Sequence, residues 1–132
     1  MAYSGNLGFP RIGAQRELKR ALEAYWKGAR DEEELQKVAR ELRRSHWLLQ
    51  SEAGLDFIPS NDFSLYDHVL EMTALVGAIP PRFDHGEGEI STETYFAMAR
   101  GTRGDDGIPP MEMTKWFNTN YHFIVPEIER RT

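Results

Sequence analysis

A lysine beside aromatic and amide side chains is the most distinctive polar group in the sequence. Lys115 directly precedes Trp116 and Phe117, and Asn118 and Asn120 follow within the same loop-like stretch. An ammonium group next to flat rings suits an anionic ligand that also carries a ring, because the cation and the aromatic faces offer both kinds of contact. The alternative is that Lys115 covers the core edge with its aliphatic stem while the asparagines form turns.

A second basic group lies near the N-terminus. Arg16 and Lys19 are three residues apart and Arg20 is four residues from Arg16, so the three side chains share one face of a helix. They fall in the first turns of a predicted helix, where the helix dipole disfavours cations. Unpaired backbone N–H groups and a guanidinium can bind an anion together at such a position. The alternative is a solvated basic surface that Glu17 partly neutralises.

Acid–base and metal chemistry find little support in the sequence. Asp62, Asp67 and His68 lie close together, but Asp62 is better explained as the cap of a helix that begins near Ser64. There is no cysteine, and no two histidines have the spacing of metal ligands. The histidines are His46, His68, His85 and His122. The sequence therefore predicts neither a catalytic residue nor a metal site in this chain.

Composition narrows the class of protein. The 132 residues suffice for one domain with a core, and hydrophobic residues make up 40% of them. The net charge of −5 argues against nucleic-acid binding, which favours a basic surface. No apolar run approaches the roughly 18 residues of a transmembrane helix, and no secretory signal is evident. We expect a cytoplasmic protein that binds neither nucleic acid nor membrane.

The pattern of apolar residues predicts an α/β order. Expected strands cover 3–9, 55–59 and 121–125, and expected helices cover 15–28, 31–54, 64–76 and 91–100, with a helical turn in 111–117. The polar face of the second helix carries both signs of charge, which is typical of a solvated surface. Strands separated by helices predict parallel pairing. Few strands leave open sheet edges, so we also expect self-association through them.

Five segments resemble one known family. They are LGFPRIG at 7–13, RELKRALEAYWKG at 16–28, DFSLYDHVL at 62–70, YFAMARG at 95–101 and EMTKWFNTNYHFIVPE at 112–127. In this order they are similar to the N-terminal portion of cobalamin-independent methionine synthase, the 5-methyltetrahydropteroyltriglutamate–homocysteine S-methyltransferase. The resemblance implies a zinc methyltransferase of methionine biosynthesis that uses no cobalamin and contains two (β/α)8 barrels. Residues 1–132 would form a single incomplete domain, a helix-rich partial barrel with the first strands and helices of the N-terminal barrel.

The resemblance also implies a substrate and a division of labour. The triglutamate tail of the folate would bind to Arg16, Glu17, Leu18 and Lys19 and to Lys115. The zinc ligands and the homocysteine site are expected in a C-terminal barrel outside this chain, so the chain would hold no catalytic residue and would be inactive alone. The alternative is a stand-alone, non-catalytic folate-binding or interaction module that pairs with a partner chain supplying the rest of the enzyme.

Overall fold

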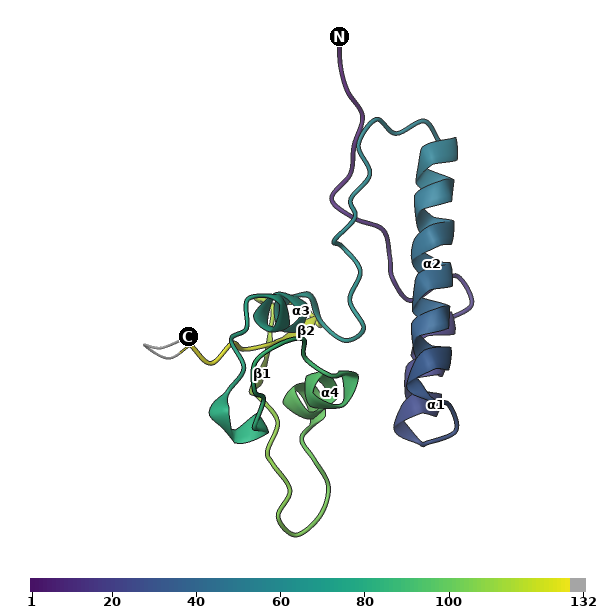
Figure 1. Cartoon of the computed structure of the whole chain (residues 1–132). Coiled ribbons are helices and arrows are strands. Elements are labelled where there is room, and N and C mark those ends of the chain that lie inside the picture. Colours follow the sequence, from purple (N-terminus) through teal and green to yellow (C-terminus); the bar gives the residue numbers. More distant parts are fainter. Residues whose placement is uncertain (129–132) are drawn as a thin grey trace. The chain divides into compact units, whose positions relative to one another are not determined.

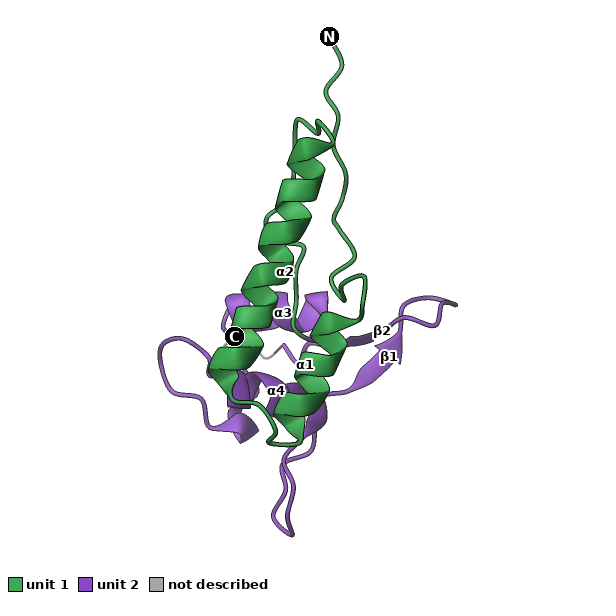
Figure 2. Ribbon diagram, turned by 90° about the vertical axis from the view of Figure 1, so that its right-hand side faces the viewer, with its two compact units in different colours: residues 1–65 green, residues 66–132 purple. Residues whose placement is uncertain are grey.

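The computed structural model describes residues 1–128 of the chain. Its internal contacts group into two compact units, residues 1–65 and 66–132 (Figure 2), where the sequence predicts one domain. Each unit is described by itself. The secondary structure is a helix-rich mixture of α and β with one two-stranded sheet. Within the described residues, no helix is both long and apolar enough to cross a membrane.

Unit 1 is built on two helices, α1 (Glu17–Trp26) and α2 (Glu32–Glu52), which pack against each other (Figure 1). The buried side chains of the pair are Leu18, Ala21, Leu22, Leu35, Ala39, Leu42 and Gln50. This confirms both helices predicted from the apolar spacing. The apolar spacing in 31–54 also predicts an inward-facing Leu49, but that side chain is 55% exposed.

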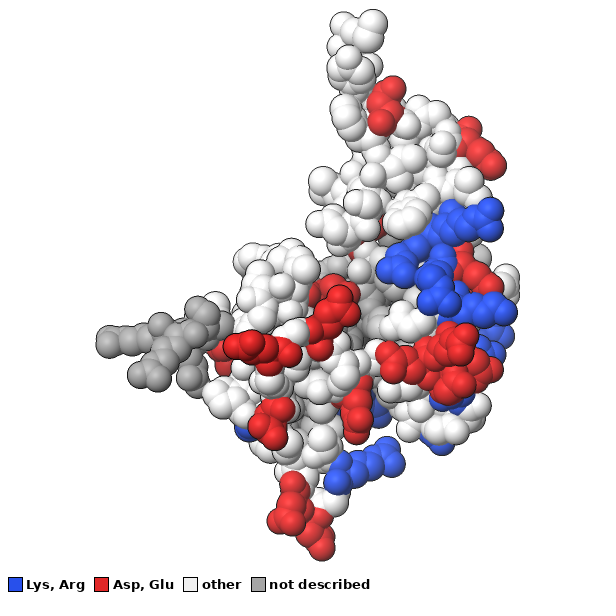
Figure 3. All heavy atoms as spheres, viewed as in Figure 1, with Lys and Arg blue, Asp and Glu red and all other residues white. Residues whose placement is uncertain are grey.

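The start of α2 follows the rules of helix capping. The Asp31 carboxylate accepts the Glu34 amide at 2.9 Å, and the Glu34 carboxylate accepts the Asp31 amide at 3.2 Å. Each side chain thus satisfies a backbone donor that the first turn leaves unpaired. On the face seen in Figure 3, both basic and acidic side chains are exposed over α2, as expected for a solvated surface.

The two extended segments of unit 1 meet in parallel at one point. Gly5 forms an isolated parallel bridge with Phe57, so the predicted pairing of 3–9 with 55–59 is realised at a single residue pair. Asp62 corrects another expectation, because it caps no helix. Its carboxylate accepts the amide of Phe9 at 2.7 Å instead. The Arg11 guanidinium donates to the carbonyl of Ser64 at 3.1 Å, which also ties 7–13 to 59–65.

Unit 2 holds α3 (His68–Leu75), a 3-10 turn η1 (Pro81–Phe83), α4 (Thr92–Arg100) and the strands β1 (Met113–Lys115) and β2 (His122–Ile124). The cap of α4 is Ser91, one of the two capping residues, with Thr92, that the sequence offers for this helix. The start of α3 differs from the prediction, because Asp67 rather than Asp62 caps this helix. Arg82 donates two hydrogen bonds to Glu127 at 2.5 and 2.6 Å, which fixes the segment after β2 to η1.

The sheet of unit 2 is an antiparallel hairpin in which Met113 pairs with Ile124 and Lys115 with His122. The predicted strand at 121–125 is confirmed, whereas the predicted helical turn at 111–117 and the parallel pairing of this strand are wrong. The loop at 116–121 has six residues. A parallel crossover needs a dozen or more residues, so a connection this short requires antiparallel strands.

Candidate ligand-binding site

The first helix begins at a cation in a strained conformation. Arg16 occupies the N-cap of α1 with φ 61° and ψ 34°, the left-handed region, and its side chain caps no backbone group. A non-glycine residue there costs about 1 kcal/mol or more. The other α-helices of the described chain begin at Asp31, Asp67 and Ser91, each with a side chain that accepts an amide of the first turn.

A tight turn holds Arg16 in this conformation. The Arg16 amide donates to the Gly13 carbonyl at 3.1 Å, and the Leu18 amide donates to the Ile12 carbonyl at 3.0 Å. Glu17 Oε2 accepts the Gln15 amide at 2.9 Å. Leu18 is fully buried and anchors the helix. Glu17 and Leu18, both predicted site residues, are therefore engaged in the structure of the turn and the core.

The cations of the segment are exposed. Within residues 1–128, the Arg16 guanidinium makes no hydrogen bond or ion pair. Lys19 lies 3.9 Å from Glu23, and both side chains are about half exposed at 51% and 47%. An exposed pair of this kind contributes little and can be exchanged for another anion. Arg20 differs, because its guanidinium donates to the Gln15 carbonyl at 2.7 Å.

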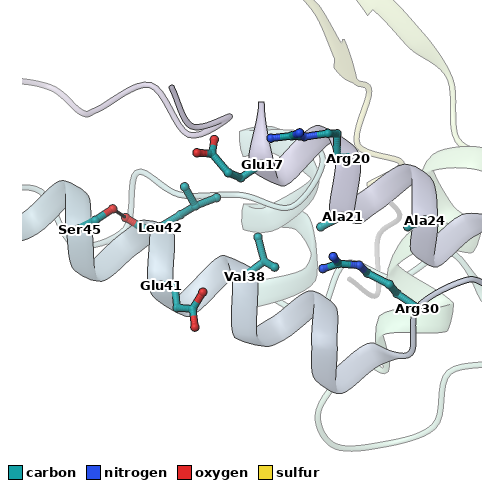
Figure 4. Close-up of a pocket in the computed structure, with 9 residues that line it drawn as sticks. All are labelled: Glu17, Arg20, Ala21, Ala24, Arg30, Val38, Glu41, Leu42 and Ser45. Atoms are coloured by element: carbon teal, nitrogen blue, oxygen red, sulfur yellow. Dashed lines mark hydrogen bonds between the residues drawn. The ribbon is translucent and has the colours of Figure 1, made fainter. Parts of the chain in front are cut away.

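A hollow of about 740 Å³ lies between α1 and α2 (Figure 4). Its floor is apolar, with Ala21, Ala24, Val38 and Leu42. Its polar lining residues are Glu17, Arg20, Arg30, Glu41 and Ser45. Two guanidinium groups and two carboxylates line the hollow, so their formal charges balance. Sequence reasoning noted Arg20 but not this hollow, since it depends on how the two helices pack.

Lys115 ends β1 and is exposed, and Trp116 and Phe117 follow it in the sequence. Trp116 forms edge-to-face contacts with Phe117 and Phe123, with ring centroids 5.2 and 5.4 Å apart. Phe117 is 81% exposed. The Lys115 ammonium has no hydrogen bond or ion pair within the described part of the chain. An exposed cation and exposed aromatic residues are thus adjacent along the chain.

Thr119 forms the turn that closes this hairpin. Its hydroxyl donates to the Trp116 carbonyl at 2.6 Å, and its backbone amide donates to the same oxygen at 3.2 Å. The Trp116 amide donates to the Tyr121 carbonyl at 2.7 Å. Asn118 and Asn120 are exposed in the loop. The turn therefore rests on a threonine rather than on the asparagine side chains.

A buried carboxylate anchors the hairpin to α3. Asp67 is 2% exposed, and its oxygens accept the Tyr121 hydroxyl at 2.5 Å, the Leu70 amide at 3.0 Å and the Ile124 amide at 3.1 Å. The sequence raised this aspartate for acid–base chemistry, but its oxygens are committed to structural hydrogen bonds. Its pairing with Tyr121 and Ile124 is long-range, so local sequence gave no signal of it.

The surroundings shift the pKa of His46 and that of Tyr95. Burial lowers the pKa of His46, whose ring lies 4.4 Å from that of Phe9. Burial and then the Glu71 carboxylate raise the pKa of Tyr95, whose hydroxyl donates to Glu71 at 2.9 Å. Among residues 1–128 there is no group of three or more metal-ligating side chains.

The predicted site residues form two groups. Arg16, Glu17, Leu18 and Lys19 lie at the start of α1 in unit 1, and Lys115 lies on the hairpin of unit 2. A family model described as "Cobalamin-independent synthase, N-terminal domain" matches residues 3–132. The chain belongs to this family. The two segments flagged by their charge are thus parts of a cobalamin-independent synthase N-terminal domain.

Curated relatives support this family and show its length. The chain is 63% identical over 127 residues to a protein of Nitrosomonas europaea and 56% identical over 138 aligned residues to one of Salinibacter ruber. A protein of Syntrophotalea carbinolica is 58% identical over 121 residues. All three are named 5-methyltetrahydropteroyltriglutamate–homocysteine methyltransferase. The matches cover 96%, 100% and 92% of this chain but only 16%, 18% and 16% of the relatives.

Proposed function

We propose that this chain is the N-terminal segment of a cobalamin-independent methyltransferase. The full enzyme would move a methyl group from 5-methyltetrahydrofolate triglutamate to homocysteine and form methionine. This segment would bind the polyglutamate tail of the folate. The observation that carries the proposal is that Arg16 and Lys115 are exposed and have no anionic partner within residues 1–128. The relatives are named for a triglutamate substrate, which supplies several carboxylates.

Other arginines of the chain are used differently. Arg11 donates to the carbonyls of Ser64 and Leu65, and Arg82 is paired with Glu127. Those guanidinium groups hold loops together. Arg16, in contrast, sits where the helix dipole and the backbone conformation both disfavour it. A cation kept at such a position is better explained by an anionic ligand than by stability.

The proposed binding relies on several weak contacts. Arg16 lies at the cap of α1 and Lys19 in its first turn, and Lys19 would leave its long contact with Glu23 for a ligand carboxylate. Each exposed contact contributes about 1 kcal/mol or less. Useful affinity for the tail therefore requires several contacts at once. Beside Lys115, the rings of Trp116 and Phe117 offer apolar surface to the aromatic part of a folate.

The remaining parts of the proposal concern polypeptide outside this chain. The two units would be pieces of an incomplete (β/α)8 barrel, and the homocysteine site and the zinc ligands would belong to the rest of a full-length family member. The residues described here do not fit a zinc ion, since they contain no suitable group of ligands. We therefore assign no step of methyl transfer to them, and we expect the purified chain to form no methionine.

A second function is favoured by the exposed apolar surface of α3. Met72 is 49% exposed, Leu75 77% and Val76 67%. A chain with such a surface could instead be a non-catalytic folate-binding or interaction module that pairs with a partner supplying the rest of the enzyme. Sedimentation of the pure chain tests this alternative. Self-association of the chain, or its binding to that partner, supports the alternative. A stable monomer that does not bind the partner contradicts it.

The tail-binding proposal is tested by titration of the chain with 5-methyltetrahydrofolate as the triglutamate and as the monoglutamate, followed by tryptophan fluorescence. We expect tighter binding of the triglutamate. Arg16→Ala and Lys115→Ala should each weaken it by up to about fivefold, the size of one exposed ion pair. Lys37→Ala, which removes an exposed cation of α2, is the matched control and should change nothing. Equal affinity for both ligands, unaffected by either substitution, would refute the proposal.

A further inference from the structure

The proposed anion site contains a carboxylate in its middle. Glu17 lies between Arg16 and Lys19 in sequence, and a free carboxylate there would repel a glutamate tail. Its side chain is only partly exposed and turns back toward the preceding loop, where Oε2 accepts the Gln15 amide at 2.9 Å. The side chain is therefore directed at its own backbone.

Gly13 leaves room for this arrangement. A Cβ atom at Gly13 would overlap the Glu17 carboxylate and lie 2.9 Å from a methyl group of Leu42, and the φ of 90° also favours glycine. The carboxylate thus packs directly over the backbone of the turn. This close approach explains why the turn needs a residue without a side chain at that position.

The residue before Arg16 is held at both of its backbone polar groups. Glu17 accepts the amide of Gln15, and the Arg20 guanidinium donates to the carbonyl of Gln15 at 2.7 Å. Figure 4 shows the Glu17 and Arg20 side chains reaching to the same side of the start of α1. The Gln15 carbonyl belongs to the peptide group that joins it to Arg16. Its orientation therefore sets the direction in which the Arg16 side chain leaves the backbone.

We propose that Glu17 is a positioning residue, which closes the turn at 13–16 and so directs Arg16 toward the ligand without contacting the tail itself. This inference rests on the proposed function. The left-handed conformation of Arg16 costs about 1 kcal/mol or more, and the hydrogen bond from Gln15 to Glu17 is one of the interactions that offset it. Without the carboxylate, Arg16 can relax to an ordinary conformation and point elsewhere.

Substitutions of Glu17 in the full 132-residue chain separate positioning from repulsion. Glu17→Ala makes the segment more positive, so repulsion alone predicts tighter binding of the triglutamate folate. Positioning predicts weaker binding, by about three- to fivefold, as for Arg16→Ala. Glu17→Gln keeps an acceptor oxygen and should restore binding to within about twofold of the wild type. Glu41→Ala, which removes another carboxylate of the same hollow, is the charge control and should not weaken binding.

The double variant Arg16→Ala/Glu17→Ala adds a test of mechanism. If Glu17 acts through Arg16, the double variant binds no more weakly than Arg16→Ala alone, because the two changes remove the same contact. Additive losses would mean that Glu17 contacts the ligand independently and would overturn the proposal. A folded Glu17→Ala variant that binds the triglutamate as tightly as the wild type, or more tightly, would overturn it as well.

A ligand-free measurement distinguishes failure of this inference from failure of the proposed function. A strong intraresidue NOE between the amide and Hα protons of Arg16 reports its positive φ. We expect the NOE in the wild type and in Glu17→Gln, and its loss in Glu17→Ala. If the wild type does not prefer the triglutamate, tail binding is refuted while the NOE still decides whether Glu17 holds Arg16. An unchanged NOE in Glu17→Ala would overturn the positioning role whatever the ligand does.

Discussion

The N-termini of α1 and α3 are stabilised in opposite ways. At α3 a buried carboxylate, Asp67, accepts two backbone amides and a tyrosine hydroxyl. At α1 the cap residue is a cation in the left-handed region. The carboxylate that accepts a backbone amide there belongs to Glu17, inside the helix. Local preference and fold agree at α3 and conflict at α1. Such conflicts concentrate at functional positions, which is why α1 is the better candidate for binding.

The largest effect is expected at the start of α3, where the local sequence preference and the fold agree. Asp67→Ala leaves the buried amides of Leu70 and Ile124 without their acceptor, and each lost partner costs about 1–3 kcal/mol. We expect a loss of about 3 kcal/mol or more in the free energy of unfolding of unit 2. Hydrogen exchange of the Leu70 and Ile124 amides measures it directly.

Asp31→Ala is the matched control, because it removes an exposed cap with one amide partner and should cost only about 1 kcal/mol. Equal costs for the two substitutions would mean that Asp67 is an ordinary cap and that the hairpin does not depend on it.

The difference between these caps also shows what the sequence could predict. The caps Asp31 and Ser91 follow a local pattern, because each precedes its helix and accepts an amide of the first turn. Asp62 and Asp67 both fit that pattern before the third helix. The choice between them was made by partners far along the chain, with Tyr121 and Ile124 lying 54 and 57 residues away from Asp67.

The candidate site was predictable to a similar degree. The unusual placement of cations picked out Arg16, Lys19 and Lys115, and the order of short motifs indicated the family. The left-handed Arg16 and the inward turn of Glu17 could not be predicted, since both oppose the intrinsic preferences of these residues. The hairpin was missed because the loop at 116–121 contains no strong turn dipeptide, and Thr119 forms the turn instead.

A smaller effect appears at alkaline pH near the start of α3. The Tyr95 hydroxyl accepts the Tyr66 amide at 3.2 Å and donates to Glu71, and burial is the main cause that raises its pKa. A raised folded-state pKa means that the stabilisation is complete below the unfolded tyrosine pKa of about 10 and is lost as the pH rises above it. The loss should be about 1.4 kcal/mol per pH unit while the folded phenol stays protonated.

Urea unfolding between about pH 9 and pH 11 measures this slope, with the range set by the ordinary tyrosine pKa. Tyr95→Phe should lower stability by about 1 kcal/mol at neutral pH, through its lost hydrogen bonds, and should remove the Tyr95 share of the alkaline slope. A variant with the wild-type slope would show that Tyr95 ionises equally easily in both states. The start of α1 has no comparable buried phenol among the described residues, so this pH dependence belongs to unit 2.

The smallest effect on stability is expected at the start of α1, where the local sequence preference and the fold conflict. Arg16→Gly places the residue best suited to φ 61° at the cap of α1. It relieves about 1–2 kcal/mol of backbone strain, and the greater freedom of glycine in the unfolded chain cancels part of this gain. We expect a net stabilisation of about 0.5 kcal/mol. Arg16→Ala keeps the strain and should gain no stability, while both variants should bind the triglutamate folate equally weakly. Urea unfolding of the three proteins side by side resolves the order. If Arg16→Gly is no more stable than Arg16→Ala, the left-handed cap carries no strain, and Arg16 would then need no ligand to explain its place.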